Sequence, residues 1–278
     1  MNPRFPFVTK RTFGFLLAII LMAGSPVLAA DTAATVTEAV NDVSHGTSQT
    51  AATEQAKVGT TLQDGEYLKT GVKSRAELEL ANKTVTRLGA NTIFNYSSTS
   101  NEIDLQAGTI LFSKPKDASP MTIKSASVTA AVVGTTGFVQ ARPHGGFLFG
   151  LIEGHATLTI DGTTYNITAG EILTFSPGKP PQVYSFNVPA LLKTAPLITR
   201  FHHGLPNQLY IDKEVAEYDD LVARGFIQPP TEPFFLTTFD GSVPTVPLPA
   251  HDSASNSLHI FNNPPPPPPP PPYNPSTG

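Results

Sequence analysis

The stretch from Val58 to Phe175 constrains this chain most, because short alternating segments there are separated by a recurrent Leu/Ile-x-x-Gly pattern. An apolar residue at a strand end, followed three residues later by glycine, suits a turn because glycine adopts positive φ at no steric cost. The intervals between the copies are unequal, so they indicate repeated turn chemistry and not a solenoid of fixed period. The copies are Leu62–Gly65, Leu68–Gly71, Leu105–Gly108, Leu151–Gly154 and Ile167–Gly170.

Period-two alternation within these segments predicts half-buried strands. In Ala76–Leu80, for example, Leu78 and Leu80 should face inward, and Glu77 and Glu79 outward. Asp161-Gly162 is the favoured two-residue hairpin turn. Ten or more short strands with short connections predict a mainly β fold, a compact β roll or sandwich. The expected core residues are Leu78, Leu80, Leu88, Ile103, Leu105, Leu111, Val139, Leu151, Leu158, Ile160, Ile167 and Leu173.

The N-terminal residues have the pattern of a secretory signal peptide. Three basic residues precede the apolar stretch Phe13–Met22, and Val27-Leu28-Ala29 fits the small-residue cleavage pattern. We therefore expect a signal peptide over residues 1–29 and a periplasmic or extracellular mature protein. The alternative is an uncleaved membrane anchor, since the uncharged stretch Thr12–Ala30 is near the lower length limit for a spanning helix.

Charge and cysteine content narrow the possible functions. Residues 1–29 hold three of the 18 basic residues and none of the 22 acidic ones, which leaves 15 basic against 22 acidic, a formal −7. A protein of that sign is a poor candidate for binding nucleic acid or anionic lipid. The chain has no cysteine. Thiol catalysis, zinc–thiolate sites and iron–sulfur clusters are therefore excluded.

The segments outside the β run have different compositions. Residues 30–56 are poorly specified, and could form a first strand or a lead-in. Residues 177–227 predict a helical extension: Asn187 caps a first helix that is interrupted at Pro196, and a second helix covers Gln208–Arg224 and ends at Gly225. Residues 228–278 form a Pro-rich tail with nine consecutive prolines at 264–272, which we expect to be disordered or extended beyond about Pro244 and to act as a spacer or a docking peptide.

Five sequence elements follow one another along the β run. They are Val58–Thr92 with its closing Arg-Leu-Gly-Ala-Asn-Thr, Ile103–Ile110, Val133-Gly134-Thr135-Thr136, Leu151–Ala156 and Ile167–Glu171. With these elements in this order, residues 57–175 resemble the FecR domain, the periplasmic β module of iron-citrate signalling regulators. The domain boundary that the resemblance implies is 57–176. The resemblance singles out Gly134, Thr135, Thr136, Glu153, Gly154 and Gly170 as family-motif positions with a structural or partner-binding role.

The chain departs from the family pattern at two levels. Val133 stands where the family has arginine, and Asn82-Lys83 replaces the Asp-Gly turn of the early hairpin. Family regulators also carry a cytoplasmic anti-sigma segment before a membrane span, whereas about a dozen residues precede the apolar stretch here. The resemblance therefore implies a β module outside the cytoplasm without the transmembrane signalling role.

The sequence offers little catalytic or metal-binding chemistry. The adjacent pair His202-His203 is expected to be exposed on a helix, and Glu214, Glu217, Asp219 and Asp220 to form a solvated helix face. Thr135 and Thr136 are expected to satisfy backbone groups at a turn. The sequence contains neither a Gly-x-Ser-x-Gly elbow nor a His-Glu-x-x-His pair. We expect no catalytic residue, no cofactor and no metal.

Three functions are consistent with this sequence. The leading hypothesis is an exported, non-enzymatic binding, scaffold or envelope-associated protein, whose partner is a protein or the cell envelope and not nucleic acid. A second is a membrane-tethered regulatory or sensor component that retains its N-terminal anchor. A third is a secreted hydrolase on a β scaffold, for which Glu153 and Glu171 are the possible carboxylates.

Overall fold

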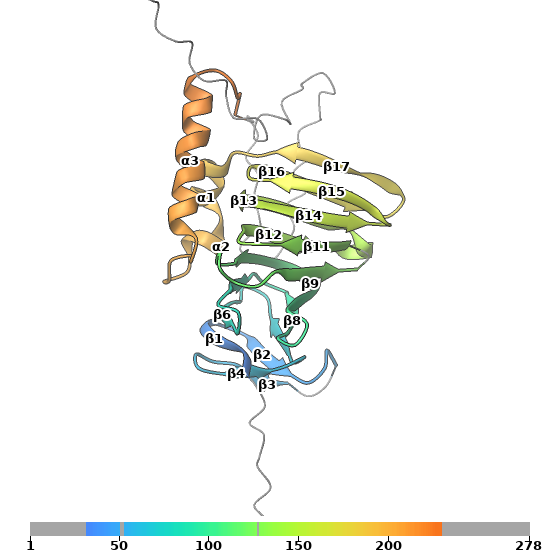
Figure 1. Cartoon of the computed structure of the whole chain (residues 1–278). Helices are drawn as coiled ribbons and strands as arrows, with labels where there is room; N and C mark the ends of the chain where they lie inside the picture. The colour runs from blue at the N-terminus through green and yellow to red at the C-terminus, as the bar shows by residue number, and fades with distance from the viewer. Residues whose placement is uncertain (1–31, 51–52, 127, 230–278) are drawn as a thin grey trace, which may run out of the picture. The chain divides into compact units, whose positions relative to one another are not determined.

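The computed structural model describes residues 32–50, 53–126 and 128–229 (Figure 1). The predicted signal peptide over residues 1–29 and nearly all of the Pro-rich tail lie outside these ranges. The described residues form a mainly β structure of seventeen strands, followed by three helices. This confirms the predicted fold class.

Nine strands form the first of two sheets, which we call sheet A. All of its neighbouring strands are antiparallel. In spatial order they are β4 (Thr61–Gln63), β1 (Thr32–Val40), β6 (Arg75–Leu80), β7 (Val85–Leu88), β9 (Glu102–Ser113), β12 (Thr136–Ala141), β13 (Phe147–Glu153), β16 (Glu171–Ser176) and β17 (Lys179–Ser185). A short 3₁₀ turn, Pro143–Gly145, connects β12 and β13.

The second sheet, sheet B, also contains nine strands and shares β9 with sheet A. Its strands are antiparallel except for the parallel pair β9–β10. Their order is β3 (Glu54–Gln55), β2 (Val43–Gly46), β5 (Tyr67–Thr70), β8 (Ile93–Ser97), β9, β10 (Met121–Ser125), β11 (Val128–Val132), β14 (His155–Ile160) and β15 (Thr163–Thr168).

Strand β9 passes from one sheet to the other at Gly108. The residues before this glycine pair with β8 and β10 in sheet B, and those after it pair with β7 and β12 in sheet A. Gly108 has φ +85°, and a Cβ there would lie 2.5 Å from the Cα of Thr92. Only glycine fits both the conformation and the space at this corner.

Two apolar clusters hold the layers together. The larger one fills the space between the sheets and includes Leu78, Ile103, Leu105, Val139 and Leu173. All twelve core residues expected from the alternation are at most 2% exposed, which confirms the strand register. Leu111 is the exception in position, because it belongs to a second cluster on the outer face of sheet A.

The helices cover that outer face. They are α1 (Val188–Thr194), α2 (Pro196–Thr199) and α3 (Gln208–Ala223), and Figure 1 shows them on one side of the strands. The second cluster combines outward side chains of β9, β12, β13 and β16 with apolar side chains of the helices and their connections. Its sheet residues are Leu111, Phe138, Leu148, Ile152 and Ile172, and its helix-segment residues are Phe186, Val188, Leu191, Ala195, Leu197, Leu205 and Ile211.

The helix boundaries agree with the sequence signals. The Asn187 side chain accepts a hydrogen bond of 2.9 Å from the Ala190 amide, as an N-cap does. Pro196 begins α2 because proline lacks the amide that would continue α1. Gly225, with φ +75°, follows the end of α3.

The predicted boundaries of the β module were too narrow at both ends. Strand β1 lies between β4 and β6 inside sheet A, so the lead-in over 30–56 supplies an interior strand. At the other end, β17 pairs with β16 although Pro180 and Pro181 lie within it. Proline is tolerated there because β17 is the edge strand of sheet A in the described structure.

Candidate functional site

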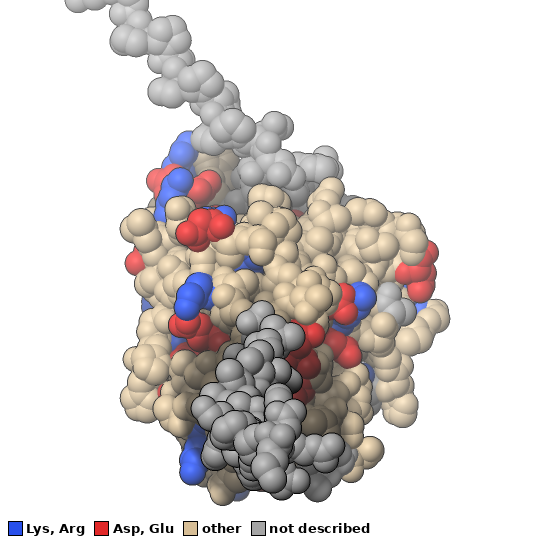
Figure 2. Space-filling model, turned by 60° about the horizontal axis from the view of Figure 1, so that its bottom comes forward, with Lys and Arg blue, Asp and Glu red and all other residues tan. Residues whose placement is uncertain are grey.

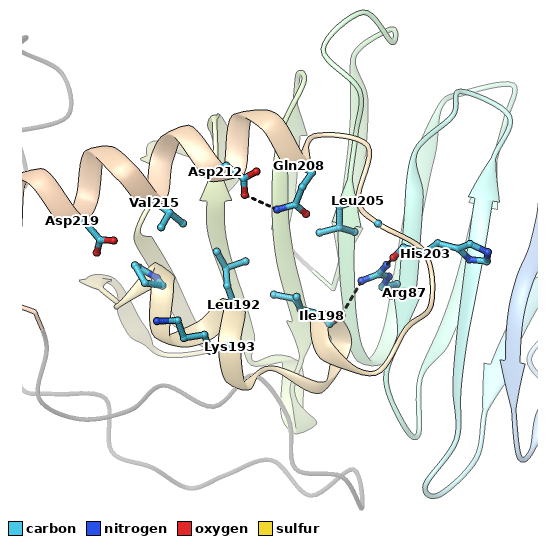
Figure 3. Close-up of a pocket in the computed structure, with 12 residues that line it drawn as sticks. Arg87, Leu192, Lys193, Ile198, His203, Leu205, Gln208, Asp212, Val215 and Asp219 are labelled. Carbon is cyan, nitrogen blue, oxygen red and sulfur yellow. Dashed lines mark hydrogen bonds between the residues drawn. The ribbon is translucent and has the colours of Figure 1, made fainter.

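A groove opens between the three helices and the loop that joins α2 to α3 (Figure 3). Its volume is about 340 Å³. Apolar side chains from three elements line it: Leu192 from α1, Ile198 from α2 and Val215 from α3. The cations Arg87 and Lys193 and the carboxylates of Asp212 and Asp219 also line it. This mixture suits an apolar group that carries polar substituents.

A buried ion pair lies at one end of the groove. Arg87 Nε donates to Glu77 Oε2 at 2.8 Å, and the two side chains are 1% and 2% exposed. The Arg87 guanidinium also donates to the carbonyl oxygens of Leu197, Ile198 and His203. Through these bonds the Arg87 cation holds both α2 and the α2–α3 loop against β7.

Glu77 and Glu38 each receive one histidine of this loop. His203 Nδ1 lies 2.8 Å from Glu77 Oε1, and His202 Nδ1 lies 2.9 Å from Glu38 Oε2. Arg75 completes the second group with an ion pair of 3.2 Å to Glu38. Burial alone would raise the pKa of Glu38, but the hydrogen bonds from His202 and the charge of Arg75 hold it below 4.5.

This arrangement corrects two expectations. His202 and His203 lie in the α2–α3 loop and not on a helix, although their side chains are 83% and 60% exposed. Glu77 faces away from the inter-sheet core as predicted, but the loop buries it. The alternation of β6 gives the face of Glu77 correctly, yet it carries no information on what covers that face. The sequence therefore could not reveal the pairing between residues more than a hundred positions apart.

A second polar cluster lies where β9 and β13 end and α3 begins. The Glu153 carboxylate is 1% exposed and accepts hydrogen bonds from Lys116 Nζ and, at 3.2 Å, from Asn207 Nδ2. Lys116 also donates to the Gly134 carbonyl at 2.7 Å. The Thr136 hydroxyl, 2.9 Å from that of Ser113, accepts from Asn207 at 3.3 Å.

Five of the six family-motif positions meet at this second cluster. Gly134 packs against Lys116, and Gly154 approaches Gly134 and Thr135 so closely that an added Cβ would lie 3.2–3.3 Å from them. The Thr135 hydroxyl donates to the carbonyls of Val133 and His155, as expected for a turn, whereas the Thr136 hydroxyl bonds to side chains.

The sixth motif position, Gly170, is connected through the backbone. Its amide donates to the Leu151 carbonyl at 2.8 Å, and its neighbour Ala169 donates to Gly154 at 3.0 Å. Gly108, Gly154 and Gly170 all have positive φ, as predicted, although Gly108 lies within β9 and not in a turn between two strands. Gly71, which belongs to the same sequence pattern, does not have positive φ.

Glu214 departs from the solvated face predicted for α3. It is partly buried, whereas Glu217, Asp219 and Asp220 are exposed. Burial raises the pKa of Glu214 above 4.5, and the charges of Glu217 and Glu153 raise it further. The helical pattern of the sequence correctly predicted that Glu214 lies in a helix. It could not show that Glu153, from the sheet, lies near that side chain.

Comparison with known proteins gives one family match, in the central part of the chain. Residues 66–157 match the FecR protein family. This match lies within the residues that resembled FecR in sequence, and it runs from just before β5 into β14. The family-motif positions 134–136 and 153–154 lie inside it, whereas β1, β15–β17 and the three helices lie outside it. No curated protein sequence matches the chain.

Two solved structures are similar over part of the chain. Both are crystal structures of a candidate anti-sigma factor from Parabacteroides distasonis, determined at 1.65 and 2.50 Å resolution. Each has 15% sequence identity and a TM-score of 0.41, and each similarity covers 45% of this chain. The chain spans 64% and 63% of the length of those two proteins.

On the face drawn in Figure 2, acidic and basic side chains of the described residues are interspersed among uncharged ones, and no cluster of cations is seen. Within residues 32–50, 53–126 and 128–229, no three histidine or acidic side chains are grouped to hold a metal ion. In the same ranges, no helix is long and apolar enough to cross a membrane.

Proposed function

We propose that this chain is an exported, non-enzymatic FecR-domain protein that binds a protein partner in the periplasm or at the cell surface. One observation carries the proposal: the polar motif residues of the FecR segment are bonded to the chain's own helices. Glu153 and Thr136 both hold Asn207 at the start of α3. The Glu153 carboxylate therefore attaches the helical segment to the sheet.

The partner site in this proposal is the groove between the helices. Its apolar lining accepts a side chain of the partner, while Lys193 and Asp219, both exposed, offer charges of opposite sign at the groove. Protein interfaces combine such an apolar centre with a polar rim. One buried polar network bonds to α2 and the other to Asn207 at the start of α3, so together they fix helices that form the groove.

Charge reversal at the groove tests this proposal. A photo-cross-linking residue placed at Gln208 should capture a discrete envelope protein from intact cells, and Lys193→Glu combined with Asp219→Lys should reduce the captured amount at least about tenfold. Lys57→Glu, an exposed substitution on the loop before β4, is the matched control and should leave capture unchanged. Equal capture by all three proteins would contradict the groove as the binding site.

A membrane-tethered regulatory role is the second candidate. The uncharged stretch Thr12–Ala30 favours it, because a retained stretch of that length could anchor the FecR segment. Fractionation of expressing cells followed by N-terminal sequencing separates the two. A mature chain that begins near Ala30 in the periplasmic fraction supports export, whereas an intact N-terminus in the membrane fraction supports the tether.

A further inference from the structure

A lysine, a glutamate and an asparagine from three distant segments meet in the second polar cluster. Lys116 lies in the loop after β9, Glu153 ends β13, and Asn207 immediately precedes α3. One carboxylate joins them: Lys116 Nζ donates to Glu153 Oε1, and Asn207 Nδ2 donates to Glu153 Oε2. Glu153 and Asn207 are 1% and 2% exposed. The buried carboxylate thus contacts both a primary amide, which is also buried, and a primary amine whose side chain is partly exposed.

The Asn207 side chain is not used as its position in the fold would suggest. It stands at the N-cap of α3, yet it makes no capping hydrogen bond. Instead, Nδ2 is turned toward the sheet and is surrounded by three acceptors. These are the Lys114 carbonyl at 2.8 Å, Glu153 Oε2 at 3.2 Å and Thr136 Oγ1 at 3.3 Å.

We propose that Lys116 and Asn207 form an intramolecular isopeptide bond with Glu153 as the proton carrier. The Lys116 ammonium gives a proton to the Glu153 carboxylate, and the neutral Nζ attacks Asn207 Cγ. The tetrahedral intermediate then collapses as the Cγ–Nδ2 bond breaks. Glu153 returns the proton to Nδ2, which leaves as ammonia. The carboxylate then accepts the surplus proton that Nζ still carries, and the departing ammonia takes it away as ammonium. The new amide joins Nζ to Cγ, and no oxidant or other co-reactant is needed.

Lys116 is the lysine placed to act as the nucleophile. Its side chain is long and 37% exposed, so rotation about its stem can carry Nζ from the Glu153 oxygen toward Cγ. The Glu153 carboxylate and the Tyr210 ring, whose centroid lies 4.8 Å from Nζ, both stabilise the ammonium form, so the proton transfer to Glu153 must come before the attack. The backbone carbonyl of Lys114 also contacts Asn207, but the amine of Lys114 is bonded elsewhere, because its Nζ donates to the Ala118 carbonyl at 2.7 Å. Holding the reacting groups together in one site lowers the entropic part of the barrier.

Such a bond would fasten α3 covalently to the loop after β9. The chain contains no cysteine, so a disulfide cannot serve this purpose. The polar cluster would then be the site of a permanent link between the FecR segment and the helices that form the groove.

Mass spectrometry of the purified full chain tests the proposal. Loss of one ammonia makes the folded wild-type protein about 17 Da lighter than its sequence. A protease digest should contain one branched peptide that joins the segment with Lys116 to the segment with Asn207. This mapping separates the bond from cyclisation of an N-terminal residue, which also releases ammonia.

Three variants define the outcome. Glu153→Gln keeps the size of the side chain but removes the proton carrier, and Lys116→Arg removes the nucleophile, so both should show the unmodified mass. Lys124→Arg, an exposed lysine of β10 that pairs with Glu102, is the matched control and should keep the deficit. Circular dichroism establishes that each protein is folded. An unmodified mass for folded wild type, even after incubation at mildly alkaline pH, would overturn the proposal, as would an ammonia deficit that persists in Lys116→Arg.

Discussion

At the scale of single residues, the ion pair of Glu77 and Arg87 is the most demanding feature of the structure. Both side chains are almost fully enclosed, and each charge depends on the other for compensation. Arg87→Met would leave the Glu77 carboxylate buried without its cation. We expect a loss of about 3–5 kcal/mol in the free energy of unfolding, measured by urea denaturation.

The double variant Glu77→Leu with Arg87→Met is the matched control for that loss. It removes both charges together, so much of the stability should return, because well-packed apolar residues can replace a buried pair at little cost. A double variant as unstable as Arg87→Met alone would show that the stability comes from the guanidinium bonds to the carbonyls of α2 and of the loop after it, and not from the ion pair.

Glu214 provides a pH test at the same scale. Burial, with the charges of Glu217 and Glu153, raises its pKa in the folded protein above the ordinary 4.5. Ionisation therefore opposes folding, and stability from this group increases as the pH falls through the raised pKa. Glu214→Gln should be more stable than wild type at pH 7, and the difference should disappear below the ordinary pKa. Chemical denaturation across that range measures it, with Glu54→Gln, an exposed residue of β3 away from Glu214, as the control.

At the scale of secondary-structure elements, two glycines allow the cost of a positive φ to be separated from the cost of a steric clash. Gly65 and Gly108 both have positive φ, but an added Cβ meets nothing within 4 Å at Gly65 and collides with Thr92 at Gly108. Gly65→Ala should cost about 1–2 kcal/mol, the price of a left-handed conformation with a Cβ. Gly108→Ala should cost clearly more, because β8 or β9 must also shift. Thermal unfolding of the two variants, side by side, checks the order, and equal losses would contradict it.

The elements also show how far the sequence could be interpreted. The alternation of Leu and Ile predicted the inward faces of the strands, and Asn187, Pro196 and Gly225 predicted where the helices begin and end. Both predictions could be made from the sequence because they depend only on neighbouring residues. Strand β1 was hard to recognise, since small residues such as Ala33 and Ala34 fill its buried positions and give weak contrast. The prolines of β17 indicated a boundary, although an edge strand has room for them.

The candidate site was less predictable than the fold. Its residues come from β7, from the loop after β9, from the end of β13 and from the helical segment, and only tertiary packing brings these together. The family resemblance did point to Glu153 and Gly134. It could not indicate Lys116 or Asn207, because neither belongs to a motif and their spacing of 91 positions has no local signature.

At the scale of the whole molecule, the helical segment and the tail that follows it should contribute very differently to stability. Removal of residues 186–278 would uncover the apolar face of sheet A formed by Leu111, Phe138, Leu148, Ile152 and Ile172, and would leave Glu77, Arg87 and Glu153 without their covering partners. We expect that truncated chain to bind a hydrophobic dye and to aggregate, since exposed apolar patches of this kind promote association.

Removal of residues 245–278 alone should leave the melting temperature nearly unchanged. That segment contains the run of nine prolines, which cannot donate ladder hydrogen bonds and offers little apolar surface for burial. Differential scanning fluorimetry of the full chain and both truncations compares them directly. A clear fall in melting temperature for the shorter deletion would mean that the tail is a structural strap and not a spacer. Unchanged stability together with loss of the partner captured at Gln208 would instead assign the polyproline run to docking, and would move the binding site from the groove to the tail.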